Sequence, residues 1–115
     1  MIPNVLSIAG SDPSGGAGIQ ADIKAISANG AYAMAALTAL TAQNTQGVAG
    51  ISLVAPDFVA AQIRTVFADI HVDAVKIGMI ATAEIAAAVA DAMADHSDIP
   101  CVLDPVMIAK GGAAL

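Results

Sequence analysis

The chain has 115 residues, of which 57% are hydrophobic and only 3% aromatic, and it carries a formal net charge of −6. This length allows one compact domain with a core and is too short for two ordinary domains. With only 4 lysines and arginines in all, the chain offers no basic surface for nucleic acid or anionic lipid, so an anionic substrate requires backbone amides or a metal ion.

The uncharged stretch 25–56 has to be tested as a membrane span. Amides and glycines interrupt every window of the ~20 apolar residues that a span requires. The first residues, Met-Ile-Pro-Asn, lack the basic region and cleavage site of a signal peptide. Cys101 is the only cysteine, so no disulfide can form within the chain. We therefore expect a cytoplasmic protein without membrane contact.

The chain opens on a strand, a glycine-rich loop and a helix. Residues 4–9 form a short β-rich run that ends at Gly10. From Ile19 the apolar residues recur at helical spacing, until Asn29 and Gly30 supply a stop signal.

Strand and helix patterns then alternate along the rest of the chain. The continuously apolar run 33–42 predicts a strand buried on both faces, although its many alanines are also compatible with a helix. Pro56 and Thr82 are suited to begin helices. We expect strands at 48–54, 74–80 and 101–103, and helices at 56–67 and 82–96. This alternation predicts a mostly parallel sheet with helices on its faces.

The chain stops soon after its last predicted strand, without the helix that normally covers such a strand. We therefore expect an incomplete sheet whose exposed apolar edge favours a homo-oligomer or a complementing chain. No repeat or linker divides residues 1–115, so we expect one unit. Within it, Phe58 and Cys101 are predicted to lie in the core, and His71 and His96 at the surface.

The carboxyl ends of the predicted strands carry polar or unusual residues, and open parallel sheets bind ligands at these ends. The residues concerned are Gly10-Ser11-Asp12, Gln43-Asn44, Gly78-Met79 and Asp104-Pro105-Val106-Met107.

The first of these ends begins the loop SIAGSDPSGGAGIQAD, residues 7–22. Gly10 and Gly15 have Walker A spacing, but the Gly-Lys-Ser/Thr that must follow is missing. A loose dinucleotide pattern begins too far beyond the strand. The glycines either let a ligand approach the backbone before the helix or serve only a tight turn, in which Asp12 is a turn residue. Asp22 either accepts a hydrogen bond from a substrate hydroxyl or is solvated.

Four segments, SIAGSDPSGGAGIQADIKA, TALTAQNTQGV, VKIGMI and LDPVMIAKGG, closely resemble the hydroxymethylpyrimidine and phosphomethylpyrimidine kinases of thiamine biosynthesis. The resemblance covers essentially the whole chain. It implies a ribokinase-like fold of three layers, with a mostly parallel sheet between helices, here incomplete at its C-terminal side. It also implies transfer of the γ-phosphoryl group of ATP, with Mg²⁺, to the hydroxymethyl group of an aminopyrimidine and then to the resulting monophosphate.

The resemblance assigns roles to individual residues. Gln43 matches the pyrimidine-reading glutamine, and a carboxamide can both donate and accept along one edge of an aminopyrimidine. Gly10 and Asp22 match substrate-contacting positions. Met79 and Val106 match apolar walls on either side of the ring.

Charged residues near the same edge have less specific interpretations. Asp104 matches an acid near the phosphates and metal, where a carboxylate orients Mg²⁺ or its waters; alternatively it only ends a strand. Lys76 and Lys110, the only lysines near this edge, either contact phosphate or are solvated, and solvation is expected for both. No direct metal ligand is assigned.

Members of this family continue well beyond 115 residues, and their later half carries a glycine-rich turn beside the catalytic base. No residue here matches that base, so the chain resembles the amino-terminal, substrate-recognising part and is expected to be inactive alone. Two other functions remain open: a pyridoxine or pyridoxal kinase, and a non-catalytic pyrimidine-binding module.

Overall fold

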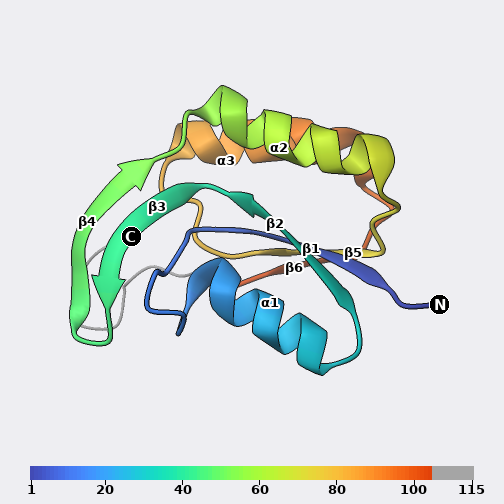
Figure 1. The fold of residues 1–115 in the computed structure, drawn as a ribbon. Helices are drawn as coiled ribbons and strands as arrows, with labels where there is room; N and C mark the ends of the chain where they lie inside the picture. The colour runs from blue at the N-terminus through green and yellow to red at the C-terminus, as the bar shows by residue number, and fades with distance from the viewer. Residues whose placement is uncertain (105–115) are drawn as a thin grey trace.

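The computed structural model describes residues 1–104, and these form an α/β structure with helices on both faces of a sheet (Figure 1). The elements are β1 (Asn4–Ala9), α1 (Gly18–Ala28), β2 (Tyr32–Leu37), β3 (Ala39–Asn44), β4 (Gly47–Leu53), α2 (Pro56–Asp69), β5 (Ala74–Ile77), α3 (Ala83–Met93), a 3-10 turn (Ala94–His96) and β6 (Cys101–Leu103).

The main sheet is parallel throughout, in the order β2-β1-β5-β6. Helix α1 covers one face, and α2 and α3 lie together on the other (Figure 1). The predicted class, a parallel α/β sheet between helices, is therefore confirmed. None of the helices within residues 1–104 combines the length and the apolarity that crossing a membrane requires.

One predicted strand is in fact two. The run 33–42 breaks at Thr38, so β2 ends in the parallel sheet, while β3 pairs with β4 in a separate antiparallel hairpin. Thr38 is fully buried; its backbone N–H donates to the carbonyl of Ala9 at 2.9 Å and its hydroxyl to the carbonyl of Met79 at 2.7 Å. The first bond continues the β1–β2 pairing, and the second anchors Thr38 to the segment after β5. No local pattern marks Thr38 as the point where the run divides.

The core lies between the sheet and the α2–α3 pair. The largest fully buried apolar side chains come from β1, α2, β5 and α3: Leu6, Ile8, Val59, Ile63, Val75 and Ile85. Helix α1, in contrast, has no fully buried residue. The α1 face of the sheet therefore leaves room for polar side chains.

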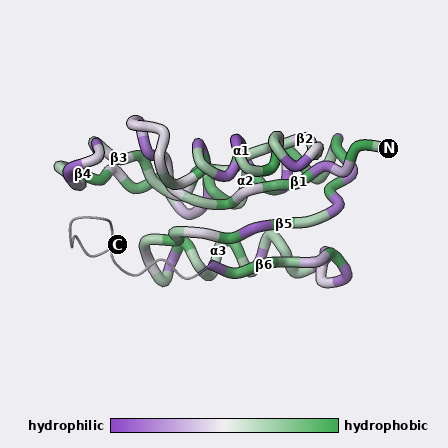
Figure 2. Tube along the Cα trace, turned by 90° about the horizontal axis from the view of Figure 1, so that it is seen from below, coloured by the Kyte–Doolittle hydropathy of each residue, from purple (hydrophilic) through white to green (hydrophobic). Residues whose placement is uncertain are grey.

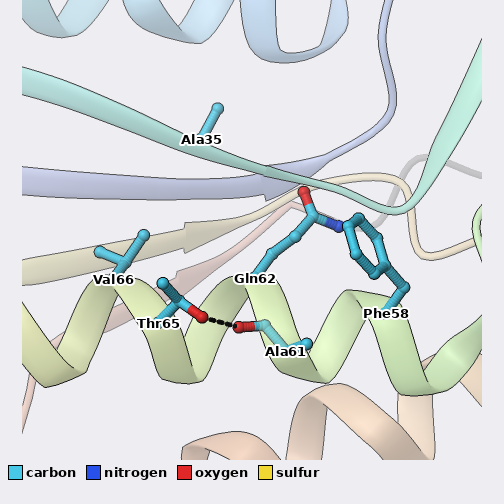
Figure 3. Close-up of a pocket in the computed structure, with 6 residues that line it drawn as sticks. All are labelled: Ala35, Phe58, Ala61, Gln62, Thr65 and Val66. Atoms are coloured by element: carbon cyan, nitrogen blue, oxygen red, sulfur yellow. Dashed lines mark hydrogen bonds between the residues drawn. The ribbon is translucent and has the colours of Figure 1, made fainter.

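Two predicted core residues are exposed. Phe58 is 62% exposed on α2, where it lines an apolar groove with Gln62 and neighbouring residues (Figure 3). Cys101 belongs to β6, the last strand of the sheet within residues 1–104, and all three residues of this strand are exposed. His71 is exposed as predicted, whereas His96 is half-buried because its ring stacks on a phenylalanine ring at 3.9 Å between centroids.

Candidate binding site at the carboxyl edge of the sheet

The carboxyl ends of β1, β5 and β6 meet at one edge, where α1 also begins (Figure 1). The β3–β4 hairpin projects beyond this edge, at the end of the molecule opposite to the N-terminus (Figures 1 and 2). This edge is the one at which parallel α/β sheets bind ligands.

Asp12 organises the loop between β1 and α1. Its side chain is buried, and its carboxylate accepts hydrogen bonds from the Ser14 hydroxyl (2.6 Å), the Ser14 N–H (2.9 Å) and the Gly16 N–H (3.0 Å). These bonds, the Ser14 hydroxyl above all, hold the pKa of Asp12 below its ordinary value despite the opposing effect of burial. Asp12 therefore accepts hydrogen bonds from within its own loop and fixes the loop's conformation. The Asp-x-Ser spacing alone indicates this role only weakly.

The lowered pKa of Asp12 predicts a pH-dependent contribution to stability. A depressed folded-state pKa contributes stability above the unfolded value, about 3.9, and the contribution is lost as pH falls through the folded value. The free energy of unfolding of Asp12→Asn should therefore fall below that of the unsubstituted protein by a constant amount above about pH 5, and this gap should narrow below about pH 4.

Urea unfolding at several pH values measures this gap. Asp69→Asn, at the exposed end of α2, serves as the control because it removes a carboxylate outside the loop. A gap for Asp12→Asn that stays constant or widens as pH falls would show that the loop does not depend on the ionised carboxylate.

Gly10 and Gly18 hold the start of α1 against the end of β1. The N–H of Ile19 donates to the carbonyl of Gly10 at 2.9 Å. Gly18 has a φ of +58°, and a Cβ there would collide with the carbonyl oxygen of Gly10. A Cβ on Gly10 would in turn collide with the terminal methyl of Met79. The structure thus brings together Gly10 and Met79, two of the predicted site residues.

Gln43 reaches this edge from the β3–β4 hairpin. The sequence had placed it at the end of a parallel strand instead. It is half-buried on β3, next to a register shift between Ala42 and Gln43 of the kind that re-aims a side chain. The hydroxyl of Thr41 lies 2.7 Å from the carbonyl oxygen of Ser11 and 3.2 Å from Oε1 of Gln43. Thr41 therefore connects Gln43 to the loop after β1.

The expectation of a solvated Lys76 is wrong. Its Nζ lies 2.9 and 3.0 Å from the carboxylate oxygens of Asp22, on α1, and 4.0 Å from Oδ2 of Asp104. Asp22 also accepts a hydrogen bond from the hydroxyl of Ser7 at 2.6 Å, so it is not simply solvated. The side chains of Lys76 and Asp22 are 24% and 17% exposed. The partners are 54 positions apart, which is why sequence spacing gave no signal.

Of the remaining predicted positions, one is exposed and two lie outside the residues that the structure describes. The Asp104 side chain is 63% exposed, and its backbone N–H donates to the carbonyl of Ile77 at 2.9 Å. Val106 and Lys110 lie outside the described residues. Among residues 1–104, no three His, Cys, Asp or Glu side chains gather as a metal site.

Solved structures define the class of protein that has this fold. The chain is similar to a phosphomethylpyrimidine kinase from Clostridium difficile, with a TM-score of 0.88 and 47% identity over 98% of this chain and 49% of that one. It is also similar to pyridoxal kinase from Bacillus subtilis, with a TM-score of 0.81 and 37% identity over 93% of this chain and 42% of that one. The predicted ribokinase-like fold of small-molecule kinases is confirmed.

Sequence comparison narrows the class to one family. The family model for phosphomethylpyrimidine kinase matches residues 12–115. The hydroxymethylpyrimidine/phosphomethylpyrimidine kinase of Salmonella typhimurium is 54% identical over 112 residues, which are 97% of this chain and 42% of that protein. The chain belongs to the phosphomethylpyrimidine kinase family, and it spans less than half the length of this curated relative.

Proposed function

We propose that residues 1–115 are the amino-terminal, substrate-binding part of a single kinase domain. Its substrates are 4-amino-5-hydroxymethyl-2-methylpyrimidine and the corresponding monophosphate, which it phosphorylates in thiamine biosynthesis in the cytoplasm. The observation that carries this proposal is the convergence of Gln43, Gly10 and Met79 at one sheet edge, through the contacts Thr41–Ser11 and Gly10–Met79.

Gln43 supplies the polar groups that an aminopyrimidine requires. Its carboxamide presents a donor and an acceptor side by side, which matches the exocyclic amino group and the adjacent ring nitrogen of the substrate. Its amide nitrogen donates no hydrogen bond to the residues that the structure describes, whereas its oxygen is contacted by Thr41. Met79, which is 8% exposed, supplies an apolar wall beside Gly10, and Val106 is proposed for the opposite wall.

The other two functions are less well supported. Pyridoxal kinase from Bacillus subtilis shares the fold at 37% identity, against 54% for the Salmonella pyrimidine kinase. The paired donor and acceptor of Gln43 also suits an aminopyrimidine edge better than a pyridoxal ring. A non-catalytic binding module is not favoured, because the relatives are named as kinases.

We further propose ATP as the phosphoryl donor and Mg²⁺ as its metal. The Bacillus subtilis pyridoxal kinase is described as an ADP complex, so a kinase of this fold holds a nucleotide. Mg²⁺ in such enzymes is held by one or two carboxylates together with phosphate oxygens and water, and it neutralises charge on the transferring group when bound. Asp104, a single exposed carboxylate, suits a place near this metal. The catalytic base is not assigned to any residue of this chain.

We propose that another part of the kinase domain, or a second copy of the chain, packs against the exposed strand β6. Val102 and Leu103 are 64% and 62% exposed there. Either a further part of the kinase domain or a second copy of the chain would bury them.

Turnover by the protein from its native source tests the proposed function. With ATP, Mg²⁺ and the hydroxymethyl aminopyrimidine, we expect mass spectrometry to detect the monophosphate and then the diphosphate. With pyridoxal in its place, we expect slower phosphorylation. The intact mass of the same sample identifies the length of chain that carries the activity. Faster phosphorylation of pyridoxal, or turnover of neither compound, would contradict the proposal.

A further inference from the structure

The ammonium group of Lys76 lies between two carboxylates to which different roles are proposed. It pairs with both oxygens of Asp22, at 2.9 and 3.0 Å, and stands 4.0 Å from Asp104. Breaking a largely buried pair costs far more than breaking a surface pair. Lys76 and Asp22 are largely buried, whereas the side chains of Arg64 and Asp91, paired between α2 and α3, are 56% and 77% exposed. The fold therefore fixes the first pair much more firmly.

Packing holds this pair in one geometry. Ser7 and Lys76 are register partners on β1 and β5, so their side chains leave the same face of the sheet, toward α1. The Ser7 hydroxyl is fully buried and donates to Asp22. A Cβ on Gly78 would lie 3.0 Å from Nζ of Lys76 and 3.0 Å from Cβ of Ala9, so the glycine leaves the space that the lysine occupies.

The acceptor sites of Asp22 show which of its atoms a ligand can use. A carboxylate has about four lone-pair sites, two on each oxygen. Oδ2 accepts from both Ser7 and Lys76, whereas Oδ1 accepts from Lys76 alone. Within residues 1–104, the second acceptor site of Oδ1 is thus the one left for a ligand hydroxyl.

We infer that Lys76 and Ser7 are positioning residues that present Oδ1 of Asp22 to the hydroxymethyl group of the substrate. The inference rests on the proposed function and adds the atoms that set the hydroxyl contact. Lys76 acts through Asp22 and does not touch the substrate. The same ammonium lies near Asp104. It therefore interacts both with Asp22, which binds the hydroxyl, and with Asp104, which is proposed to lie near the phosphates.

Two ligands that differ only in the hydroxyl group test this inference by calorimetric titration. They are 4-amino-5-hydroxymethyl-2-methylpyrimidine and 4-amino-2,5-dimethylpyrimidine. We expect the unsubstituted protein to prefer the first. Lys76→Met should weaken binding of the first by about tenfold, as expected for a misdirected hydrogen bond to a charged group, and leave the second unchanged. Arg64→Met, which breaks the exposed pair, should change neither affinity.

Two further variants separate positioning from a general structural role. In an Asp22→Asn background, Lys76→Met should cause no additional loss, because its effect passes through Asp22. Ser7→Ala removes one hydrogen bond and keeps the ion pair, so it serves if Lys76→Met does not fold. It should weaken only the hydroxymethyl ligand, by about threefold.

Other outcomes overturn the inference. If Lys76→Met weakens binding of both ligands equally, the substitution loosens the whole site. If its loss adds to that of Asp22→Asn, Lys76 contacts the ligand directly. If the affinities of Lys76→Met and Ser7→Ala are unchanged, these residues do not position Asp22. Failure of the unsubstituted protein to bind either ligand would overturn the proposed function itself, and the inference with it.

Discussion

Replacing Gly18 with alanine is expected to destabilise the protein by about 2–5 kcal/mol. The φ of +58° imposes left-handed strain on any residue with a Cβ, which costs about 1–2 kcal/mol. The new Cβ would also collide with the carbonyl oxygen of Gly10, and relieving such overpacking costs about 1–3 kcal/mol. That carbonyl accepts the hydrogen bond from Ile19 that joins β1 to α1, so it cannot move without loosening the loop.

Two other glycines provide matched controls. Gly30 has a φ of +84°, but a Cβ there would meet nothing within 4 Å, whereas Gly50 has neither the positive φ nor a close neighbour. Gly30→Ala should therefore cost about 1 kcal/mol, and Gly50→Ala should change stability by less than about 0.5 kcal/mol. Urea unfolding followed by circular dichroism measures all three. A cost for Gly18→Ala no larger than that for Gly30→Ala would contradict the close approach to Gly10.

Replacing Gln43 with glutamate is expected to weaken binding of the hydroxymethyl aminopyrimidine by about 10- to 100-fold. The change preserves size and the acceptor oxygen but replaces the amide donor with a second, charged acceptor. The ring nitrogen of the substrate would then face a carboxylate oxygen, so two acceptors would oppose each other. An unsatisfied buried acceptor of this kind costs about 1–3 kcal/mol.

Gln46→Glu is the matched control for this experiment. It places the same charge in the exposed turn between β3 and β4, three positions away in the chain. Calorimetric titration should find its affinity within about twofold of the unsubstituted protein, as for other surface substitutions. Equal affinities for Gln43→Glu and the unsubstituted protein would remove Gln43 from the pyrimidine contact.

Local signals explain why most elements could be predicted from the sequence. Pro56 begins α2, and Thr82 caps α3 by accepting a hydrogen bond from the N–H of Ile85 at 3.1 Å. Asn29 and Gly30 end α1 as expected. The break at Thr38 carried no such signal, because the apolar pattern continues through it and the turn depends on partners far away in the chain.

In the candidate site, too, some residues could be predicted from motifs, whereas other contacts depend on the fold. The motifs at the strand ends pointed to Gly10, Gln43 and Met79, and the structure connects these residues through the hairpin and the loop. The partnership of Lys76 with Asp22 depends on the register of β1 with β5 and on the packing of α1, neither of which spacing reveals. Burial of Phe58 was predicted wrongly because a hydrophobic side chain does not specify the side of α2 on which it lies.

An NMR titration of the isotope-labelled protein with the hydroxymethyl aminopyrimidine decides whether the ring binds between Gln43 and Met79, because it reports which residues the ring contacts. We expect the signals of the Gln43 side-chain amide, the Gly10 backbone amide and the Met79 methyl group to shift together and to saturate at one concentration of ligand. The side-chain amide of Gln46 should not move. Shifts confined to the groove beside Phe58 on α2, or no shifts at all, would contradict this binding site.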